Sequence, residues 1–217
     1  MAAAADSRST PRKRLSAEDR RAAILDAAIE VFGDRGFHAS SIDEIATSAG
    51  ISKALIYEHF PSKRELHVSL LERSAHDIFG RLARSADTSE PGQIRLRKGV
   101  DAFLEWAERH PGAFRLLFRD ALEADVAEVI ERLQAQATGA IAALIAQEPI
   151  ERRPQETADQ VRLAVEVFAQ QLSGSVQSLA IWWQAHPEVQ REFLVDCVMD
   201  YAWLGLERVR AGERVKH

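Results

Sequence analysis

The first regular hydrophobic pattern begins after residue 15 and has the spacing of an amphipathic helix. Ser16 is a favourable N-cap, and acidic residues follow it in the first turn. We expect Gly33 and Gly36 to end this helix, because glycine is common where a helix stops. Its buried stripe would consist of Ile24, Leu25, Ala28, Val31 and Phe32.

Two shorter helices are predicted directly afterwards, joined by a turn. Ser41 and Glu44 form the capping-box pattern at the start of the first, and Ser52 caps the second. Gly50 stands where the backbone must leave the first helix with a positive φ. This arrangement is typical of the helix-turn-helix, whose second helix enters the DNA major groove. The core of this three-helix unit would contain Ile24, Ala28, Val31, Phe32, Ile42, Ile45, Ala46, Ile51, Ile56 and Phe60.

The rest of the chain also has helical periodicity, interrupted by segments that contain Pro and Gly. Pro61 suits the first turn of a fourth helix that reaches about residue 84. The apolar run from Thr138 to Ala146 is expected to be central and buried. The sequence therefore predicts an all-α protein. Further helices are predicted over about 93–109, around 114–118, and over about 125–147, 156–185 and 188–210.

The net charge of −5 is unfavourable for binding DNA, but the charges are unevenly distributed. Residues 1–66 carry equal numbers of basic and acidic side chains, so the whole negative charge lies in the remainder. Residues 1–15 have no hydrophobic period and contain Arg12, Lys13 and Arg14. We interpret them as a flexible basic arm, which either solubilises the chain or enters the DNA minor groove.

Composition gives little support to catalysis. The chain has no run of about 18 apolar residues, so no membrane span is expected, and its single Cys197 fits a reducing cytoplasm. Cys197 belongs to a helix expected to be buried, which favours an inert thiol. The histidines form no metal-binding pair on one helix, and no Gly-rich phosphate loop is present. We predict no catalytic residues, no metal site and no cofactor.

The end of the second short helix carries a family resemblance. Residues 56–63, Ile-Tyr-Glu-His-Phe-Pro-Ser-Lys, resemble the Leu-Tyr-x-His-Phe-x-x-Lys pattern of the tetracycline-repressor (TetR) family of transcriptional regulators. The resemblance is specific over about residues 17–68. It implies three parts: a flexible basic arm at 1–15, a helix-turn-helix DNA-binding domain at 16–62 with its motif at 41–60, and a helical ligand-binding and dimerisation domain at 63–217.

The resemblance also implies a bacterial cytoplasmic repressor, associated with the nucleoid when bound to DNA. Such a protein would bind a near-palindromic operator as a homodimer and would leave it when a small hydrophobic ligand binds. Two alternatives remain at this point. A DNA-packaging protein would bind DNA without sequence preference, and a helical enzyme with a chance helix-turn-helix would not bind DNA.

Eight residues are predicted to contact double-stranded DNA. Lys53 could reach a guanine or a phosphate, whereas Ala54 and Leu55 occupy positions where family members contact bases. Leu55 is apolar and could pack on a thymine methyl group, or it could fill the helix edge. Glu58 departs from the usual Tyr or His of the family, and it either places a negative charge near the DNA backbone or faces away from it. Ser41 and Ser52, at helix N-termini, are predicted to contact phosphates. The resemblance implies that Tyr57, His59 and Lys63 contact the DNA backbone, with a position half in the core as the alternative for Tyr57.

The predicted C-terminal domain has more apolar positions than two helices need for one core. In the TetR family the last two long helices pair with their symmetry mates, which implies a two-fold dimer. Ordinary core packing is the alternative for each candidate. The candidate interface residues are Val165, Leu172, Val176, Leu179, Val198 and Tyr201.

Large apolar side chains with few polar neighbours between residues 93 and 185 predict a pocket for a hydrophobic or aromatic ligand. The body of the chain also resembles lipid- and acyl-CoA-responsive regulators of actinobacterial type. Core packing is again the alternative. The candidate lining residues are Phe103, Trp106, Phe114, Phe118, Ile130, Gln134, Phe168, Gln171, Ser175 and Trp182.

Overall fold

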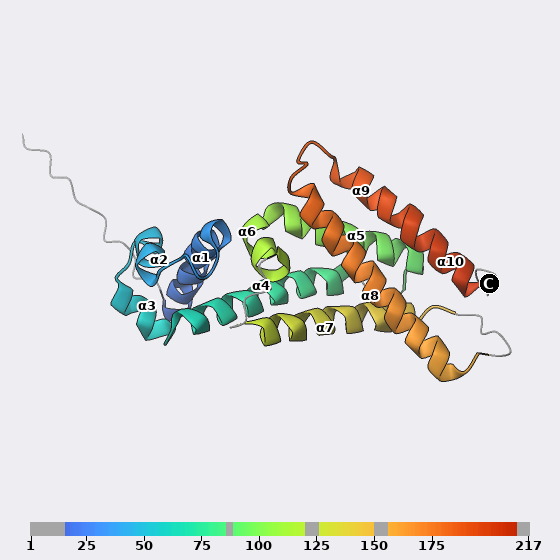
Figure 1. The fold of residues 1–217 in the computed structure, drawn as a ribbon, viewed down its shortest axis with the longest axis horizontal. Helices are drawn as coiled ribbons and strands as arrows, with labels where there is room; N and C mark the ends of the chain where they lie inside the picture. The colour runs from blue at the N-terminus through green and yellow to red at the C-terminus, as the bar shows by residue number, and fades with distance from the viewer. Residues whose placement is uncertain (1–15, 86–88, 120–125, 150–155, 212–217) are drawn as a thin grey trace, which may run out of the picture.

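The computed structural model describes residues 16–85, 89–119, 126–149 and 156–211. Within these ranges every regular element is a helix, and no strand is assigned. Figure 1 shows an elongated molecule with α2 (Ile42–Ala49) and α3 (Lys53–His59) at one end and the last helices toward the other. The predicted all-α fold class is confirmed.

One long helix, α4 (Lys63–Ser85), runs from the end that carries α3 into the body of the molecule (Figure 1). It packs against α1 (Ala17–Arg35), α5 (Gly92–Arg109) and α7 (Ala127–Ile145). The remaining elements are α6 (Pro111–Phe114), the π-helical turn η1 (Arg115–Arg119), α8 (Ala158–Trp183), α9 (Arg191–Val198), the π-helical turn η2 (Met199–Trp203) and α10 (Leu204–Arg210).

Side-chain caps set the starts of α1 and α2, as the sequence predicts. Ser16 Oγ accepts a hydrogen bond from the backbone N–H of Asp19 at 3.0 Å. Ser41 Oγ accepts one from the backbone N–H of Glu44 at 3.2 Å. In both caps the acidic side chain also accepts a hydrogen bond from the backbone N–H of the capping serine, which completes a capping box.

The end of α1 differs from the prediction. Gly33 lies inside the helix, and only Gly36, with a φ of 78°, ends it. A Cβ at Gly33 would lie 2.9 Å from Cα of Gly112 in α6, closer than real Cβ atoms come to backbone. Gly33 therefore allows the close packing of α1 on α6 and does not terminate the helix.

The start of α4 also differs from the prediction. Pro61 precedes the helix, and Ser62 Oγ accepts a hydrogen bond from the backbone N–H of Glu65 at 3.1 Å, as an N-cap does. A proline disfavours helical backbone at the residue before it, and Phe60 is extended with φ −139° and ψ 107°. Pro61 thus ends α3 and does not begin α4.

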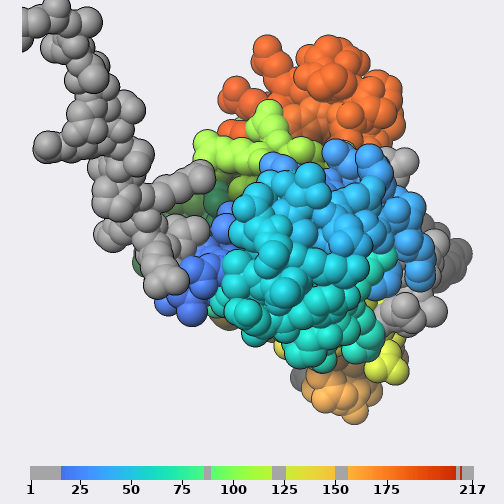
Figure 2. Space-filling model, turned by 90° about the vertical axis from the view of Figure 1, so that its left-hand side faces the viewer, coloured from blue at the N-terminus to red at the C-terminus, as the bar shows by residue number. Residues whose placement is uncertain are grey.

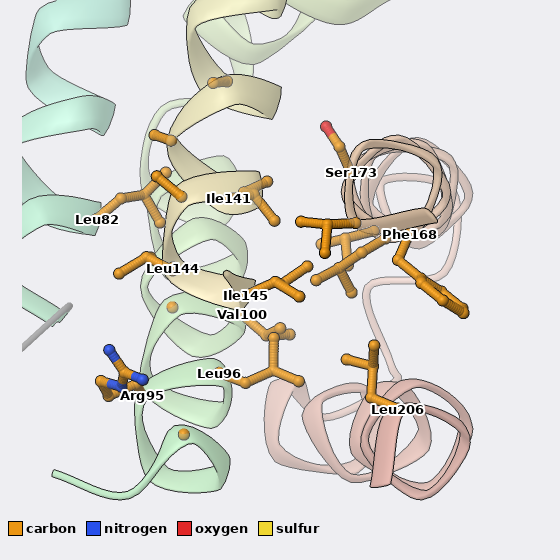
Figure 3. A pocket seen from close by; sticks show the side chains of 18 of the residues that line it. Leu82, Arg95, Leu96, Val100, Ile141, Leu144, Ile145, Phe168, Ser173 and Leu206 are labelled. Carbon is orange, nitrogen blue, oxygen red and sulfur yellow. The ribbon is translucent and has the colours of Figure 1, made fainter. Parts of the chain in front are cut away.

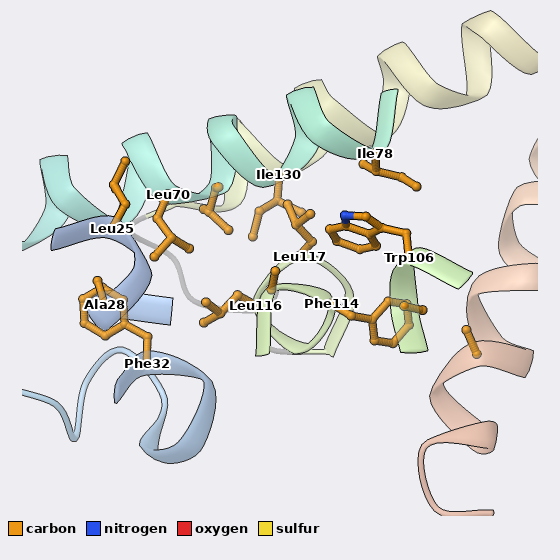
Figure 4. Close-up of a cluster of buried hydrophobic side chains, with 14 of the residues drawn as sticks. Leu25, Ala28, Phe32, Leu70, Ile78, Trp106, Phe114, Leu116, Leu117 and Ile130 are labelled. Carbon is orange, nitrogen blue, oxygen red and sulfur yellow. The ribbon is translucent and has the colours of Figure 1, made fainter. Parts of the chain in front are cut away.

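The buried core runs without a break from the three-helix unit into the rest of the chain. Figure 4 shows Phe32 of α1, Leu70 of α4 and Phe114 of α6 in one hydrophobic cluster. Of the core residues predicted for the three-helix unit, Val31 and Ile51 are partly buried and the others are buried. The helix-turn-helix unit therefore shares one hydrophobic core with the body of the molecule.

The apolar second half of α7 is less buried than expected. Ala140, Ala143 and Ala146 are exposed, and the buried residues of α7 are Val129 and Ile130 near its start. Because α7 packs mainly on α8 and touches α4, the small side chains of its second half border a cavity and solvent instead of a closed core.

Candidate DNA-binding surface and ligand pocket

The turn between α2 and α3 fixes the geometry of the helix-turn-helix. Gly50 has left-handed backbone angles, φ 64° and ψ 35°, and the N–H of Ile51 donates to the Ala46 carbonyl at 3.0 Å. This is the glycine-centred helix end that the sequence predicts. Ile56 and Phe60 of the following segment are buried, so the opposite face of α3 points outward.

The predicted DNA-contact residues are distributed over this outward face and its edges. Figure 2 shows α2 and α3 at the front of this end of the molecule. Ser52, Lys53, Ala54 and Tyr57 are exposed, and Ser41, Leu55, His59 and Lys63 are half-buried. Arg12, Lys13 and Arg14 of the predicted arm lie outside the described residues.

Lys53 is held by a neighbouring carboxylate that the sequence reasoning missed. Its Nζ donates a hydrogen bond to Asp43 Oδ2 of α2 at 2.8 Å, and this bond raises the pKa of Lys53. Both side chains are exposed, so the pair contributes little to stability. A phosphate oxygen can therefore replace the Asp43 carboxylate at little cost.

Two other predicted phosphate contacts are also engaged within the protein. The hydroxyl of Ser41 donates to Glu44 Oε2 at 3.0 Å while it caps α2. The capping hydrogen bonds from Ser41 lower the pKa of Glu44. The Lys63 ammonium lies 4.3 Å from the centroid of the Phe37 ring, a cation–π contact that orients the side chain at the start of α4.

A cavity of about 760 Å³ lies among α4, α5, α7 and α8, with α10 at its edge. Most of its lining is aliphatic, and Figure 3 shows Leu82, Leu96 and Ile141 around it, from three different helices. Of the ten predicted lining residues, three line this cavity: Phe103, Phe118 and Phe168.

The other seven predicted lining residues lie outside this cavity. Trp106, Phe114 and Ile130 belong to the buried core, and Trp106 Nε1 donates to Asp77 Oδ2 at 2.9 Å. Gln171 and Trp182 are exposed on α8, and Gln134 and Ser175 are half-buried away from the cavity. Aromatic size predicted burial correctly for the core residues but did not indicate which face of a helix meets the cavity.

The residues proposed for the dimer interface are mostly turned inward. Val165, Leu172 and Val176 line the cavity, and Val198 is buried in the core. Leu179 packs partly buried against that core. Only Tyr201 of the six is exposed, at 68%.

A different set of apolar residues is exposed on the last helices. Cys197, which was expected to be buried, is exposed between Phe193 and Tyr201 at a spacing of one helical turn. Helices α8 and α9–α10 thus carry apolar side chains that the described residues leave uncovered. These are Leu163, Val167, Ile181, Trp182, Phe193, Tyr201 and Leu204.

The cavity is physically connected to the helix-turn-helix unit. Phe118, which lines the cavity, belongs to the same π-helical turn as Arg115. Arg115 Nε donates to the Gly33 carbonyl of α1 at 2.9 Å and its Nη2 reaches Asp34 Oδ1 at 3.5 Å. A displacement of Phe118 would therefore be transmitted to α1, and π-helical turns are frequent at functional sites.

Two family models match this chain. The model for bacterial regulatory proteins of the tetR family matches residues 24–70, and the model for the tetracyclin repressor-like C-terminal domain matches residues 91–205. This chain belongs to the TetR family. As a TetR-family protein it is a DNA-binding transcriptional regulator, which confirms both the predicted family and the predicted class of function.

Relatives of this TetR-family chain include transcriptional regulators and nucleoid occlusion factors. The HTH-type transcriptional activator FasR of Mycolicibacterium smegmatis is 31% identical over 198 residues, which cover 90% of this chain and 87% of that protein. A TetR-like regulator from Rhodococcus sp. RHA1 is 29% identical with a TM-score of 0.74, over 89% of this chain and 99% of that chain. The regulator FadR from Bacillus subtilis, solved in complex with stearoyl-CoA, has the same fold at 16% identity and a TM-score of 0.70, over 89% and 99% of the two chains.

Two further observations concern the described part of this TetR-family chain. None of its helices is both long and apolar enough to cross a membrane. Its His, Cys, Asp and Glu side chains form no group of three or more that could hold a metal ion.

Proposed function

We propose that this regulator binds its operator as a homodimer and is released from it when a long aliphatic ligand enters the cavity among α4, α5, α7 and α8. The observation that carries the proposal is the apolar lining of that cavity. FasR is named an activator, so the effect on transcription depends on where the operator lies. The proposed common step is loss of DNA binding.

The shape of the cavity favours a chain-like ligand over a compact one. Its lining on α8 extends from Gln160 to Gln177, which corresponds to roughly 25 Å along the helix axis. A volume of about 760 Å³ over that length gives a mean cross-section of about 30 Å². Such a channel suits an extended hydrocarbon chain. The complex of FadR with stearoyl-CoA supports the same ligand class.

The exposed apolar face of the last helices supports a homodimer. On α8, Leu163, Val167, Gly174 and Ile181 follow one another at helical spacing and form one exposed stripe. A Cβ at Gly174 would meet no atom of its own chain within 4 Å among the described residues. Glycine costs roughly 0.5–1 kcal/mol in a helix interior. Close approach of a partner helix would explain why glycine stands there.

The proposed switch uses the two connections between the cavity and the DNA-binding end. Ligand entry would displace α4 and, through Phe118 and Arg115, the end of α1. The spacing of the two α3 helices in the dimer would then no longer match successive major grooves. The ligand can do this only by binding the DNA-incompetent state more tightly, typically by about 1–3 kcal/mol.

The first experiment selects bound sequences from random DNA at near-physiological salt and then measures release of the recovered motif by oleate and oleoyl-CoA. We expect one inverted repeat, released by at least one of the two lipids. Binding without any motif would instead support DNA packaging.

A pair of variants tests whether the lipid that releases the protein from DNA binds in the cavity. Ala164 lines the cavity, whereas Ala135 is exposed on α7 outside it. Ala164→Trp should keep DNA binding and lose release, because the indole fills the channel. Ala135→Trp should behave like the wild type. Release that persists in Ala164→Trp would place the ligand elsewhere.

The dimer is tested by the mass of the protein in solution. Gly174→Arg should produce a monomer in sedimentation velocity, because the long charged side chain keeps the partner helix away. Gly139 on α7 is the matched control, since a Cβ there also meets nothing within 4 Å. Gly139→Arg should remain dimeric. A dimer for Gly174→Arg would contradict an interface on this face of α8.

A further inference from the structure

One end of the apolar cavity is charged. Arg95 in the first turn of α5 lines the cavity and is only 8% exposed, and Glu148, just beyond α7, lines it as well. Figure 3 shows Arg95 below Leu144, at the edge of a group of side chains in which Ser173 is the other labelled polar residue. A buried arginine in an apolar wall is costly unless it is paired, so its partners indicate what this end can bind.

The guanidinium of Arg95 is only partly satisfied. Its Nη1 donates to Gln147 Oε1 at 3.1 Å, and its Nη2 forms an ion pair with Glu148 Oε1. Its Nε is buried and has no hydrogen-bond partner among the described residues. A carboxylate binds arginine most strongly when its two oxygens accept hydrogen bonds from two nitrogens along one edge of the guanidinium group. Glu148 therefore uses one half of the Nε–Nη2 edge and leaves the other half empty.

The backbone beside Arg95 leaves room for a carboxylate. A Cβ at Gly92 would lie less than 3 Å from the carboxylate of Glu148, so this carboxylate would have to shift if position 92 carried a side chain. Gly92 and Arg95 lie one helical turn apart at the start of α5, and both line the cavity. These residues form a built acceptor site for one carboxylate at the end of a long hydrocarbon channel.

We propose that Arg95 binds the carboxylate of a long-chain fatty acid, and that Glu148 occupies this position as an internal substitute when no ligand is present. This inference rests on the proposed function, namely that an aliphatic ligand fills the cavity. A ligand carboxylate would accept from both Nε and Nη2, which satisfies the buried Nε that Glu148 leaves without a partner.

The exchange has a structural consequence. Glu148 and Gln147 are held by Arg95 at the end of α7, so the hydrogen bonds of Arg95 tie this turn to the start of α5. Displacement of Glu148 would remove the ion pair that joins this turn to α5. Ligand binding would thereby change the packing of α7, which contacts α4 through the Arg132–Glu72 ion pair at 3.2 Å.

The test compares three probes of one chain length: oleate, methyl oleate and oleoyl-CoA. Their affinities for the full-length protein are measured by displacement of a fluorescent fatty acid, below the aggregation concentration of each lipid. The wild type should bind oleate about tenfold more tightly than methyl oleate, the effect of one charge-assisted hydrogen bond. Oleoyl-CoA, whose thioester is uncharged, should bind like the methyl ester.

Three variants assign the preference to the proposed site. Glu148→Gln removes the competing carboxylate at nearly constant volume and should strengthen oleate binding by about fivefold to tenfold without affecting methyl oleate. Arg95→Lys keeps the positive charge but removes the two parallel donors of the guanidinium group. It should reduce the preference for oleate over methyl oleate to about twofold or less. Arg97→Lys is the matched control, because Arg97 lies on the same helix but is exposed and paired with Asp196. It should leave all three affinities unchanged.

The possible outcomes separate this proposal from the proposed function. Equal binding of oleate and methyl oleate by the wild type, or equal weakening of both by Arg95→Lys, would overturn the carboxylate site and leave an aliphatic ligand in place. Tighter binding of oleoyl-CoA, with no response to Glu148→Gln, would mean that the coenzyme and not Arg95 is recognised. Failure of all three probes to bind would overturn the proposed ligand class together with this site.

Discussion

Lowering the pH should destabilise this protein through one buried histidine. His67 of α4 is 2% exposed, its ring stacks on Phe37 with a centroid distance of 4.6 Å, and Phe32 lies 5.2 Å away. Neither ring nitrogen has a hydrogen-bond partner among the described residues. Burial, with smaller contributions from Lys63 and His38, lowers the pKa of His67 from its ordinary value of 6.5 to about 4.

The sign and size of the effect follow from these two pKa values. Between pH 6.5 and pH 4 the unfolded chain binds a proton at His67 and the folded chain does not, so the free energy of unfolding falls as the pH falls. The full difference corresponds to about 3 kcal/mol, of which roughly 2.5 kcal/mol is lost between pH 7.5 and pH 4.5. Above about pH 7.5 the effect is nearly absent, because His67 is neutral in both states.

Urea unfolding followed by tryptophan fluorescence, at several pH values from 7.5 to 4.5, measures this term. His67→Leu removes the titrating group and keeps an apolar side chain, so the wild type should lose about 2.5 kcal/mol more than the variant over this range. Carboxylates such as Glu44 titrate in both proteins and cancel in the comparison. Parallel pH profiles for the two proteins, or a native-state NMR titration of His67 with a midpoint near 6.5, would refute the reasoning.

Three further predictions concern helix packing and DNA binding. Gly33→Ala should destabilise the fold by about 1–3 kcal/mol in thermal denaturation, because its Cβ meets α6 backbone at 2.9 Å; Gly139→Ala, in open space on α7, should stabilise by up to about 1 kcal/mol. Lys63→Ala should lower the salt slope of DNA binding by about 0.9 per subunit for all sequences, and an unchanged slope would remove Lys63 from the phosphate contacts. Asp43→Asn should strengthen binding to non-operator DNA in a polarisation titration, because it removes a negative charge 2.8 Å from the Lys53 ammonium; unchanged affinity would mean that Lys53 does not reach the phosphates.

The helix-turn-helix could be predicted because its determinants are local. A serine that caps a helix and a glycine that leaves one act within four residues of their own positions, so they are visible in the sequence. The end of α2 at Gly50 and the start of α3 at Ser52 followed from this rule. The same rule failed at Gly33, because this glycine makes room for the backbone of Gly112 in α6, which is 79 residues away in the sequence.

The ligand cavity and the exposed face of α8 could not be assigned because helical periodicity does not give direction. When a helix has apolar residues on two faces, its sequence pattern does not tell which face turns toward the core and which toward a partner. Val165 and Leu172 were predicted to meet a partner subunit, yet they line the cavity, while Leu163 and Val167 on the opposite face are exposed. At about 100° per residue, Leu163 and Val165 point roughly 160° apart around the helix, and only the packing of α7 on α8 decides which face turns inward.

The sequence by itself determined the elements whose causes are local: the all-α class, the caps, the glycine turn and the family to which the chain belongs. The tertiary structure alone decided which charged groups meet. The pairing of Lys53 with Asp43 joins two helices, and that of Arg95 with Glu148 joins a helix to the turn after another, 53 positions away. Such pairs depend on how helices cross, which is set by the sum of many weak packing contacts and not by any short motif.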